Sequence, residues 1–283
     1  MREKNPHRRP PLAACLIAAV LAGCTPESGS VSPQAKDAVA EHGAAAKAEQ
    51  AEPAALAPPA QDKTVAEETA DYTFRYSYPA AAAAIPGLKA KLEEDIAKSR
   101  AELAKDAAEF RAETQKDNFP FRQYDASYEW AVVTDLPGWL SLSEEIYAYT
   151  GGAHGNTGYA ATLWDKTAGK ERDVLSLFTA KSALEKAVRP ALCAALDKER
   201  SARRGEKVVR DQQDWMNACI GLDDTTVILG SAGRKAFDRI GFLIGPYAAG
   251  PYAEGTYEVT LPVTAAVLAA VKPEFRGSFA LGR

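Results

Sequence analysis

The chain of 283 residues carries 34 basic and 38 acidic side chains, which gives a net charge of −4 at pH 7. Residues 71–283 alone hold 27 basic and 29 acidic residues. This near balance predicts neither a basic stripe for nucleic acid nor a basic face for a membrane. The length of this part is sufficient for one large or two small domains with cores of their own.

The first 23 residues have the pattern of a secretion signal. Four basic residues precede the apolar run LAACLIAAVLAG, which is too short to span a membrane. The run ends in LAGC, and small residues before Cys24 resemble the lipobox of bacterial lipoproteins. We expect cleavage after Gly23 and acylation of Cys24, because several acyl chains hold a protein stably on a membrane. An ordinary signal peptide with a chance cysteine is the alternative.

The mature chain is expected to begin with a disordered tether. Residues 24–70 contain eight acidic residues, three lysines and no aromatic residue. Such a segment buries too little apolar surface to offset the entropy lost on ordering. Without residues 1–23, which hold four basic residues and one acidic residue, the net charge is −7. Thr25 stands where an aspartate would change sorting, so we expect the outer membrane, facing the periplasm, in a host that has one.

Two of the four cysteines remain for the folded part. Cys15 leaves with the signal and Cys24 takes lipid, so Cys193 and Cys219 form one pair. An exported protein lies in an oxidising environment, which predicts a disulfide between them. Two separate buried thiols are the alternative.

Residues 71–149 are predicted to form a first α+β unit. The segment YTFRYSYPA at 72–80 alternates aromatic and polar residues, as a strand does. A long helix is predicted from Pro86, and two strands follow in YDASYEWAVVTDL and WLSLSEEIYAYT. The helix has a single apolar stripe made of Leu88, Leu92, Ile96, Leu103 and Phe110.

Residues 150–283 are predicted to form a second unit of the same class. A strand, GYAATLWD, precedes the segment DVLSLF and a helix with leucine and valine every four residues over 184–196. Pro190 predicts a kink or an interruption in that helix. The segment SARRGEK is predicted to be a solvated loop, and strands in TTVILG, IGFLIG and YEVTLP precede a short helix, TAAVLAAV. The whole pattern indicates an α+β fold of mostly antiparallel sheet, with helices packed on one face.

The block TGGAHGNT at 150–157 is the first candidate site. Its glycines permit backbone angles closed to other residues, and the asparagine can close an Asx turn. Successive amides in such a turn bind anions, and the histidine adds a donor. A corner between two strands explains the same residues, and both interpretations stay open. The candidate ligand-binding residues are Thr150, Gly151, Gly152, His154 and Asn156.

The second candidate is the segment GPYAAGPYAEGTYEV. Tyr247, Tyr252 and Tyr257 recur every five residues between prolines and glycines. Aromatic rings on a rigid backbone make good contact surface at low entropic cost. Packing of the same rings on the body of the domain is the alternative.

Recognised catalytic motifs are absent from the sequence. It contains no GxxxxGK[ST], GxSxG or HExxH pattern, and residues 71–283 hold one histidine. We therefore expect no enzymatic activity, no cofactor and no histidine-rich zinc centre. A hydrolase without a recognisable motif is a remaining alternative.

Together these segments resemble a known family over roughly residues 71–275. YTGGAHGNT, DVLSLF and PYAAGPYAEGTYEVTLP look like the exported domain in the ectodomain of the lysozyme-sensing anti-sigma factor RsiV. The upstream half, YSYPA with the long helix, resembles its companion domain, which also precedes the catalytic domain of the peptidoglycan deacetylase PdaC.

The resemblance implies two small α+β units that bind a ligand at the cell envelope. The sequence shows no sigma-binding segment, no membrane span and no deacetylase domain, so it looks like the sensor ectodomain on a lipid anchor. The expected ligand is peptidoglycan or a secreted protein such as lysozyme, and no nucleic acid is expected. A structural envelope lipoprotein that binds nothing is the alternative.

Lipidation gives the first testable prediction. Labelled fatty acid should enter the wild-type protein, whereas Cys24→Ser should lose the label and membrane association together, because the thiol is the acylated group. Radiolabelling with membrane fractionation measures both. A mutant that stays labelled and membrane-bound would contradict the assignment.

Overall fold

The computed structural model describes residues 60–283, which belong to one compact unit. The predicted signal peptide, the lipidation at Cys24 and the tether up to residue 59 lie outside the described residues. Within 60–283, no helix has the length and apolar character needed to cross a membrane.

A six-stranded sheet, called here the first sheet, forms the first half of the structure. Its strands follow one another in chain order, and all neighbours pair antiparallel except β2 and β3, which are parallel. A bulge between Val132 and Thr134 interrupts the register of β3 against β4. The strands are β1 (Lys63–Glu68), β2 (Tyr72–Tyr78), β3 (Tyr124–Leu136), β4 (Trp139–Tyr149), β5 (Asn156–Asp165) and β6 (Lys170–Arg172).

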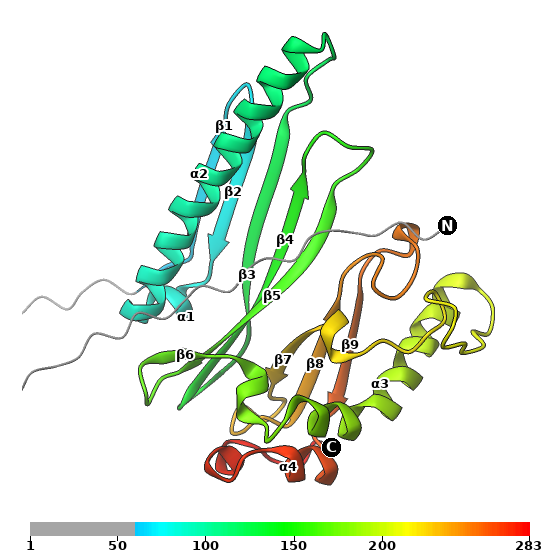
Figure 1. Ribbon diagram of the computed structural model, residues 1–283. Helices are drawn as coiled ribbons and strands as arrows, with labels where there is room; N and C mark the ends of the chain where they lie inside the picture. The colour runs from blue at the N-terminus through cyan, green and yellow to red at the C-terminus, as the bar shows by residue number, and fades with distance from the viewer. Residues whose placement is uncertain (1–59) are drawn as a thin grey trace, which may run out of the picture. The chain divides into compact units, whose positions relative to one another are not determined.

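The long helix α2 (Pro86–Lys116) connects the two parallel strands and packs on this sheet (Figure 1). It follows the short helix α1 (Ala80–Ala83), and Pro86 suits its first position because a proline there loses no helical hydrogen bond. Four members of the predicted stripe are buried, and Phe110 is partly buried. They meet the aromatic face of β2, made of Tyr72, Phe74, Tyr76 and Tyr78.

A three-stranded antiparallel sheet carries the second half, with order β7-β8-β9. Helix α3 (Lys181–Arg204) packs against it and runs unbroken through Pro190, until Gly205 ends it at a left-handed φ of 71°. Strand β7 also contacts β3, β4 and β5, so the second core includes residues of both sheets. The remaining elements are η1 (Val174–Leu177), η2 (Leu222–Asp224), β7 (Thr226–Gly230), β8 (Arg239–Ile244), η3 (Tyr252–Glu254), β9 (Tyr257–Pro262), α4 (Ala265–Ala270) and η4 (Pro273–Ser278).

The α+β class is confirmed, and two predicted boundaries need correction. The tether was expected to reach residue 70, but β1 already begins at Lys63 and pairs with β2 along its whole length. The division at 149/150 falls between β4 and β5, which pair with each other over ten residue pairs. The first sheet therefore continues to β6 and is not divided at the glycine block.

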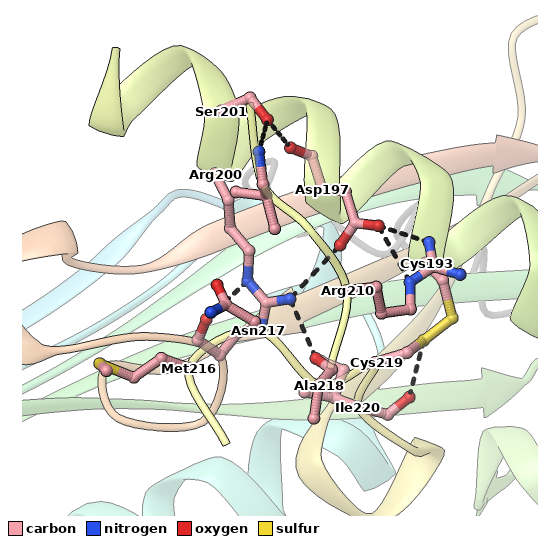
Figure 2. Close-up of polar contacts among 12 residues, drawn as sticks. Cys193, Asp197, Arg200, Ser201, Arg210, Met216, Asn217, Ala218, Cys219 and Ile220 are labelled. Atoms are coloured by element: carbon pink, nitrogen blue, oxygen red, sulfur yellow. Dashed lines mark hydrogen bonds and ion pairs between the residues drawn. A yellow bond between two sulfur atoms is a disulfide. The ribbon is translucent and has the colours of Figure 1, made fainter. Parts of the chain in front are cut away.

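The predicted disulfide is confirmed. Cys193 of α3 bonds to Cys219 in the segment before η2, with Cα atoms 5.3 Å apart (Figure 2). The bond closes a loop of sequence separation 26 that includes the irregular segment after α3.

Removal of this bond should destabilise the protein measurably. Replacing both cysteines by alanine should lower the free energy of unfolding by about 3 kcal/mol, because a loop of this length gains chain entropy in the unfolded state. Urea unfolding with and without reductant measures the effect. Reductant should weaken the wild type and leave the double variant unchanged; an equal response of both would contradict the assignment.

Candidate functional site

The loop between β4 and β5 requires glycine at two positions. Gly151 has a φ of 86°, and a Cβ there would lie 2.9 Å from Cε1 of Phe110 in α2. Gly155 is buried, and a Cβ there would overlap the ring of Tyr147. Gly152 faces open space, so its lack of a side chain is not required by packing. These two glycines therefore serve the geometry of a tight turn between β4 and β5, which we call the glycine corner.

The other predicted members of this block differ in their exposure. Thr150 and His154 are exposed, and Asn156 is exposed as the first residue of β5, where it pairs with Ala148. Gly155, which was not among the predicted candidates, is the buried residue that brings the loop against Tyr147.

The loop of residues 245–256, between β8 and β9, is called here the tyrosine loop. It carries two of the three candidate tyrosines at or near the surface. Tyr247 is 50% exposed and has a φ of 68°, which is uncommon for a residue with a side chain. Tyr252 is half-buried in η3. Such a strained residue persists only where its surroundings hold it, and it marks a position where function is worth seeking.

Tyr257 does not belong to this surface, which corrects the prediction. It begins β9 with an inward side chain that is 2% exposed, because alternate residues of that strand face the core. Its hydroxyl donates to Glu254, and the guanidinium of Arg203 lies 3.9 Å from its ring centroid.

The two candidate loops meet through His154, Tyr247 and Tyr252, which we call the aromatic cluster. The rings of His154 and Tyr252 stack with centroids 3.7 Å apart and planes 19° apart. Tyr247 lies 5.5 Å from Tyr252, centroid to centroid. The Tyr252 hydroxyl donates to the carbonyl of Gly155 at 2.8 Å, so the tyrosine loop is tied to the glycine corner.

Hydrogen bonds also determine which ring nitrogen of His154 carries the hydrogen. Nδ1 lies 2.9 Å from the Gly155 carbonyl oxygen, which accepts only, so Nδ1 carries the hydrogen. In the neutral ring Nε2 is then an acceptor, and the Tyr247 hydroxyl at 3.2 Å donates to it. Tyr247 and His154 are both exposed, so the cluster offers aromatic surface to the solvent.

A fully buried arginine donates hydrogen bonds to the backbone of the tyrosine loop and of a neighbouring segment. Arg200 of α3 is 0% exposed, and its Nε donates to the carbonyl of Ala249 at 2.7 Å. Its Nη1 donates to the carbonyl of Ala218 at 2.9 Å, next to the disulfide (Figure 2). Asp197 lies 3.5 Å from the same nitrogen and also pairs with Arg210. One side chain therefore joins the helix, the tyrosine loop and the disulfide-bonded segment.

A second arginine fixes the far end of the same loop. Arg204 makes two parallel hydrogen bonds to the Glu254 carboxylate, of 2.7 and 3.0 Å. It also donates to Asn217 at 2.6 Å. Burial alone would raise the pKa of Glu254, but hydrogen bonds from Arg204 and Tyr257 outweigh burial and lower that pKa. Such bidentate pairs are among the more geometrically specific interactions in proteins.

A hollow of about 380 Å³ lies beside Gly151 and is lined by apolar residues together with the charged Glu113, Asp117 and Arg122. Its wall includes Phe110, Pro120, Gly151 and Phe119, whose side chain is 70% exposed. Among residues 60–283, no group of three or more histidine, cysteine, aspartate or glutamate side chains is arranged to hold a metal ion.

Comparison with known proteins identifies one domain. Residues 65–157 match the family model described as "Deacetylase PdaC", so this segment, called here the PdaC-like domain, is similar to that family, as predicted for residues 71–149. The resemblance to RsiV stays a prediction. No curated protein matches the chain significantly.

Two solved structures of low similarity accompany this match. A DUF3298 family member from Bacteroides fragilis is 16% identical, with a TM-score of 0.48, over 77% of this chain and 96% of its own. A DUF3298 family protein from Pseudomonas aeruginosa is 15% identical, with a TM-score of 0.46, over 80% of this chain and 99% of its own.

The glycine corner offers a matched pair of substitutions. Gly151→Ala should lower the free energy of unfolding by about 1–2 kcal/mol, because alanine resists a left-handed backbone and meets Phe110. Gly152→Ala should change it by less than about 0.5 kcal/mol, since its Cβ meets open space. Urea unfolding of both variants measures the difference. Equal losses would contradict the role assigned to Gly151.

Proposed function

We propose that the protein is an exported, lipid-anchored binding protein of the cell envelope. The lipid would be carried by Cys24, in the outer membrane and facing the periplasm where the host has one. The proposed ligand is peptidoglycan or a secreted protein such as lysozyme, and it would contact the aromatic cluster. The PdaC-like domain supports an association with the envelope, and the lipobox of the sequence supports the anchor.

The observation that carries the proposal is the meeting of the two loops. Tyr247 and His154 are 93 residues apart, yet their side chains share a hydrogen bond on an exposed surface. The glycine corner lies within the PdaC-like segment, and the tyrosine loop lies outside it. Each loop is held by contacts below the surface, so the rings are ordered before a ligand arrives. Such preorganisation reduces the entropy lost on binding.

The cluster has the chemistry of a contact surface. Tyrosine and histidine rings bring a flat apolar face and a polar edge, and both are rigid. The apolar face of a sugar ring or an apolar side chain of a protein would pack on the outer side of Tyr247. The hydrogen bonds of the cluster link His154, Tyr247, Tyr252 and Gly155 to one another, with no carboxylate among them. We therefore propose binding and not catalysis, although the matched family is named for a deacetylase.

A structural role without a ligand is the second candidate. The same hydrogen bonds satisfy both ring nitrogens of His154 and the hydroxyl of Tyr252 within the protein. Under this alternative the cluster joins two loops and nothing more. A hydrolase without a recognisable motif is the least supported alternative.

Binding assays on single variants separate these functions. Tyr247→Ala should weaken binding of the 60–283 fragment to purified peptidoglycan or to lysozyme at least fivefold, because a central aromatic contact contributes more than about 1 kcal/mol. His154→Ala should weaken it as well. Pull-down with sacculi and calorimetry with lysozyme measure the two ligands separately.

The control is Trp215→Ala, which removes another exposed aromatic side chain outside the cluster. It should leave binding unchanged. Thermal melts of each variant test folding in parallel. Binding that persists undiminished in Tyr247→Ala and His154→Ala would support the structural alternative, as would reduced stability with unchanged binding per folded molecule.

A further inference from the structure

A buried carboxyl group in the first sheet has no assigned role. Glu144 lies on β4, and its side chain faces the core beneath α2 together with Leu140 and Leu142. It is 4% exposed, and its Oε1 has no hydrogen-bond partner among the described residues. A charged carboxylate in such a position is unfavourable, because water is excluded and Oε1 receives no donor in its place.

The groups around Glu144 include the carboxylate of Asp95, so that a negative charge on Glu144 would be the second one in this region. The indole Nε1 of Trp130 in β3 donates to the hydroxyl of Tyr76 in β2 at 2.7 Å. That hydroxyl donates to Asp95 of α2 at 2.9 Å, so Asp95 is the carboxylate that receives a donor. The ring of Tyr128 in β3 stacks on Tyr76, with centroids 5.5 Å apart.

The charges facing this site are negative. Asp95 and Glu102 approach from α2; Asp95 acts on Glu144, and Glu102 acts on Tyr128. The neighbours on β2 and β3 are the phenols and the indole just described, and Ala160, the partner of Glu144 in β5, carries no charge. No lysine or arginine acts on Glu144 among the described residues. Burial and the charge of Asp95 raise the pKa of Glu144 to about 8, and the Trp130 indole opposes them.

We propose that Glu144 is a proton switch: its carboxyl is neutral in the folded protein at neutral pH, and loss of its proton in mildly alkaline solution loosens α2 from the first sheet. Ionisation would add a second negative charge near that of the partly buried Asp95 of α2, which already acts on Glu144. Two like charges, one of them buried, repel each other and favour separation of α2 and β4, the elements that carry them. The candidate site rests on the same helix, since Gly151 after β4 meets Phe110 of α2.

The direction of the pH dependence follows from proton binding. An ordinary glutamate in the unfolded chain releases its proton near pH 4.5, whereas the folded protein keeps it to about pH 8. Between these values the folded state binds one more proton than the unfolded state. The contribution of Glu144 to stability is therefore full below pH 4.5 and falls as the pH rises, with up to about a tenfold change in the unfolding constant per pH unit. Above pH 8 this contribution is constant.

The test compares the mature protein with two neighbouring variants by urea unfolding from pH 5 to pH 9. Glu144→Gln keeps the shape of the neutral acid and cannot ionise. Its unfolding constant should agree with that of the wild type near pH 5 and become at least about a hundredfold smaller than the wild-type value by pH 8. Glu145→Gln, at the exposed neighbouring position, should follow the wild type. The same pH dependence in wild type and Glu144→Gln would overturn the proposal.

Two further measurements are made on the native protein without denaturant. Infrared spectroscopy should show the carbonyl band of a protonated carboxylic acid at pH 7 in the wild type and in Glu145→Gln, and no such band in Glu144→Gln. Amide hydrogen exchange in α2 and β4 should be faster in the wild type than in Glu144→Gln at pH 9, and should differ little between the two at pH 5. Absence of the acid band from the wild type would overturn the proposal even if Glu144→Gln failed to fold.

Discussion

The second half of the structure depends on the buried guanidinium of Arg200. A buried charge is costly unless its donors find acceptors, and here two backbone carbonyls and Asp197 supply them for Nε and Nη1. The buried Nη2 has no hydrogen-bond partner among the described residues. These acceptors come from α3, from the tyrosine loop and from the segment that the disulfide closes. Arg200 thereby holds three pieces of chain in one arrangement, together with the disulfide and the hydrogen bonds of Arg204 to Glu254 and Asn217. The positive φ of Tyr247 is tolerated because the loop around it is constrained in this way.

Much of the fold could be predicted from local patterns. The apolar stripe of α2 and the alternation in β2 each reflect one buried face, and the structure has both where they were expected. Strand β1 was missed because its sequence, KTVAEE, is mostly exposed and so carries no apolar signal. The parallel pairing of β2 with β3 was missed as well. The sequence of a strand does not indicate beside which strand the chain returns after a connecting helix.

The candidate site was predicted in part. The glycine corner and the tyrosine loop were both identified, because their unusual backbone conformations require glycines and prolines, which are visible in the sequence. Their contact could not be predicted, since it depends on how β5 and β8 are placed and no local spacing encodes it. Arg204 was assigned to a solvated loop although it ends α3 and pairs with Glu254. The spacing of Arg200 and Arg204, four residues apart on one helix face, was the available signal.

The crossover between β2 and β3 has a consequence for the order of folding. Strands β3 to β6 form a meander in which each strand pairs with the next, and β1 pairs with β2 as a hairpin. These contacts are local and close short loops. The pairing of β2 with β3 must instead bring together segments separated by the whole of α2. Chain entropy is therefore lost before the contacts between these strands can stabilise the structure. The pairing of the hairpin with the meander, across the length of α2, is thus the least local contact of the first sheet.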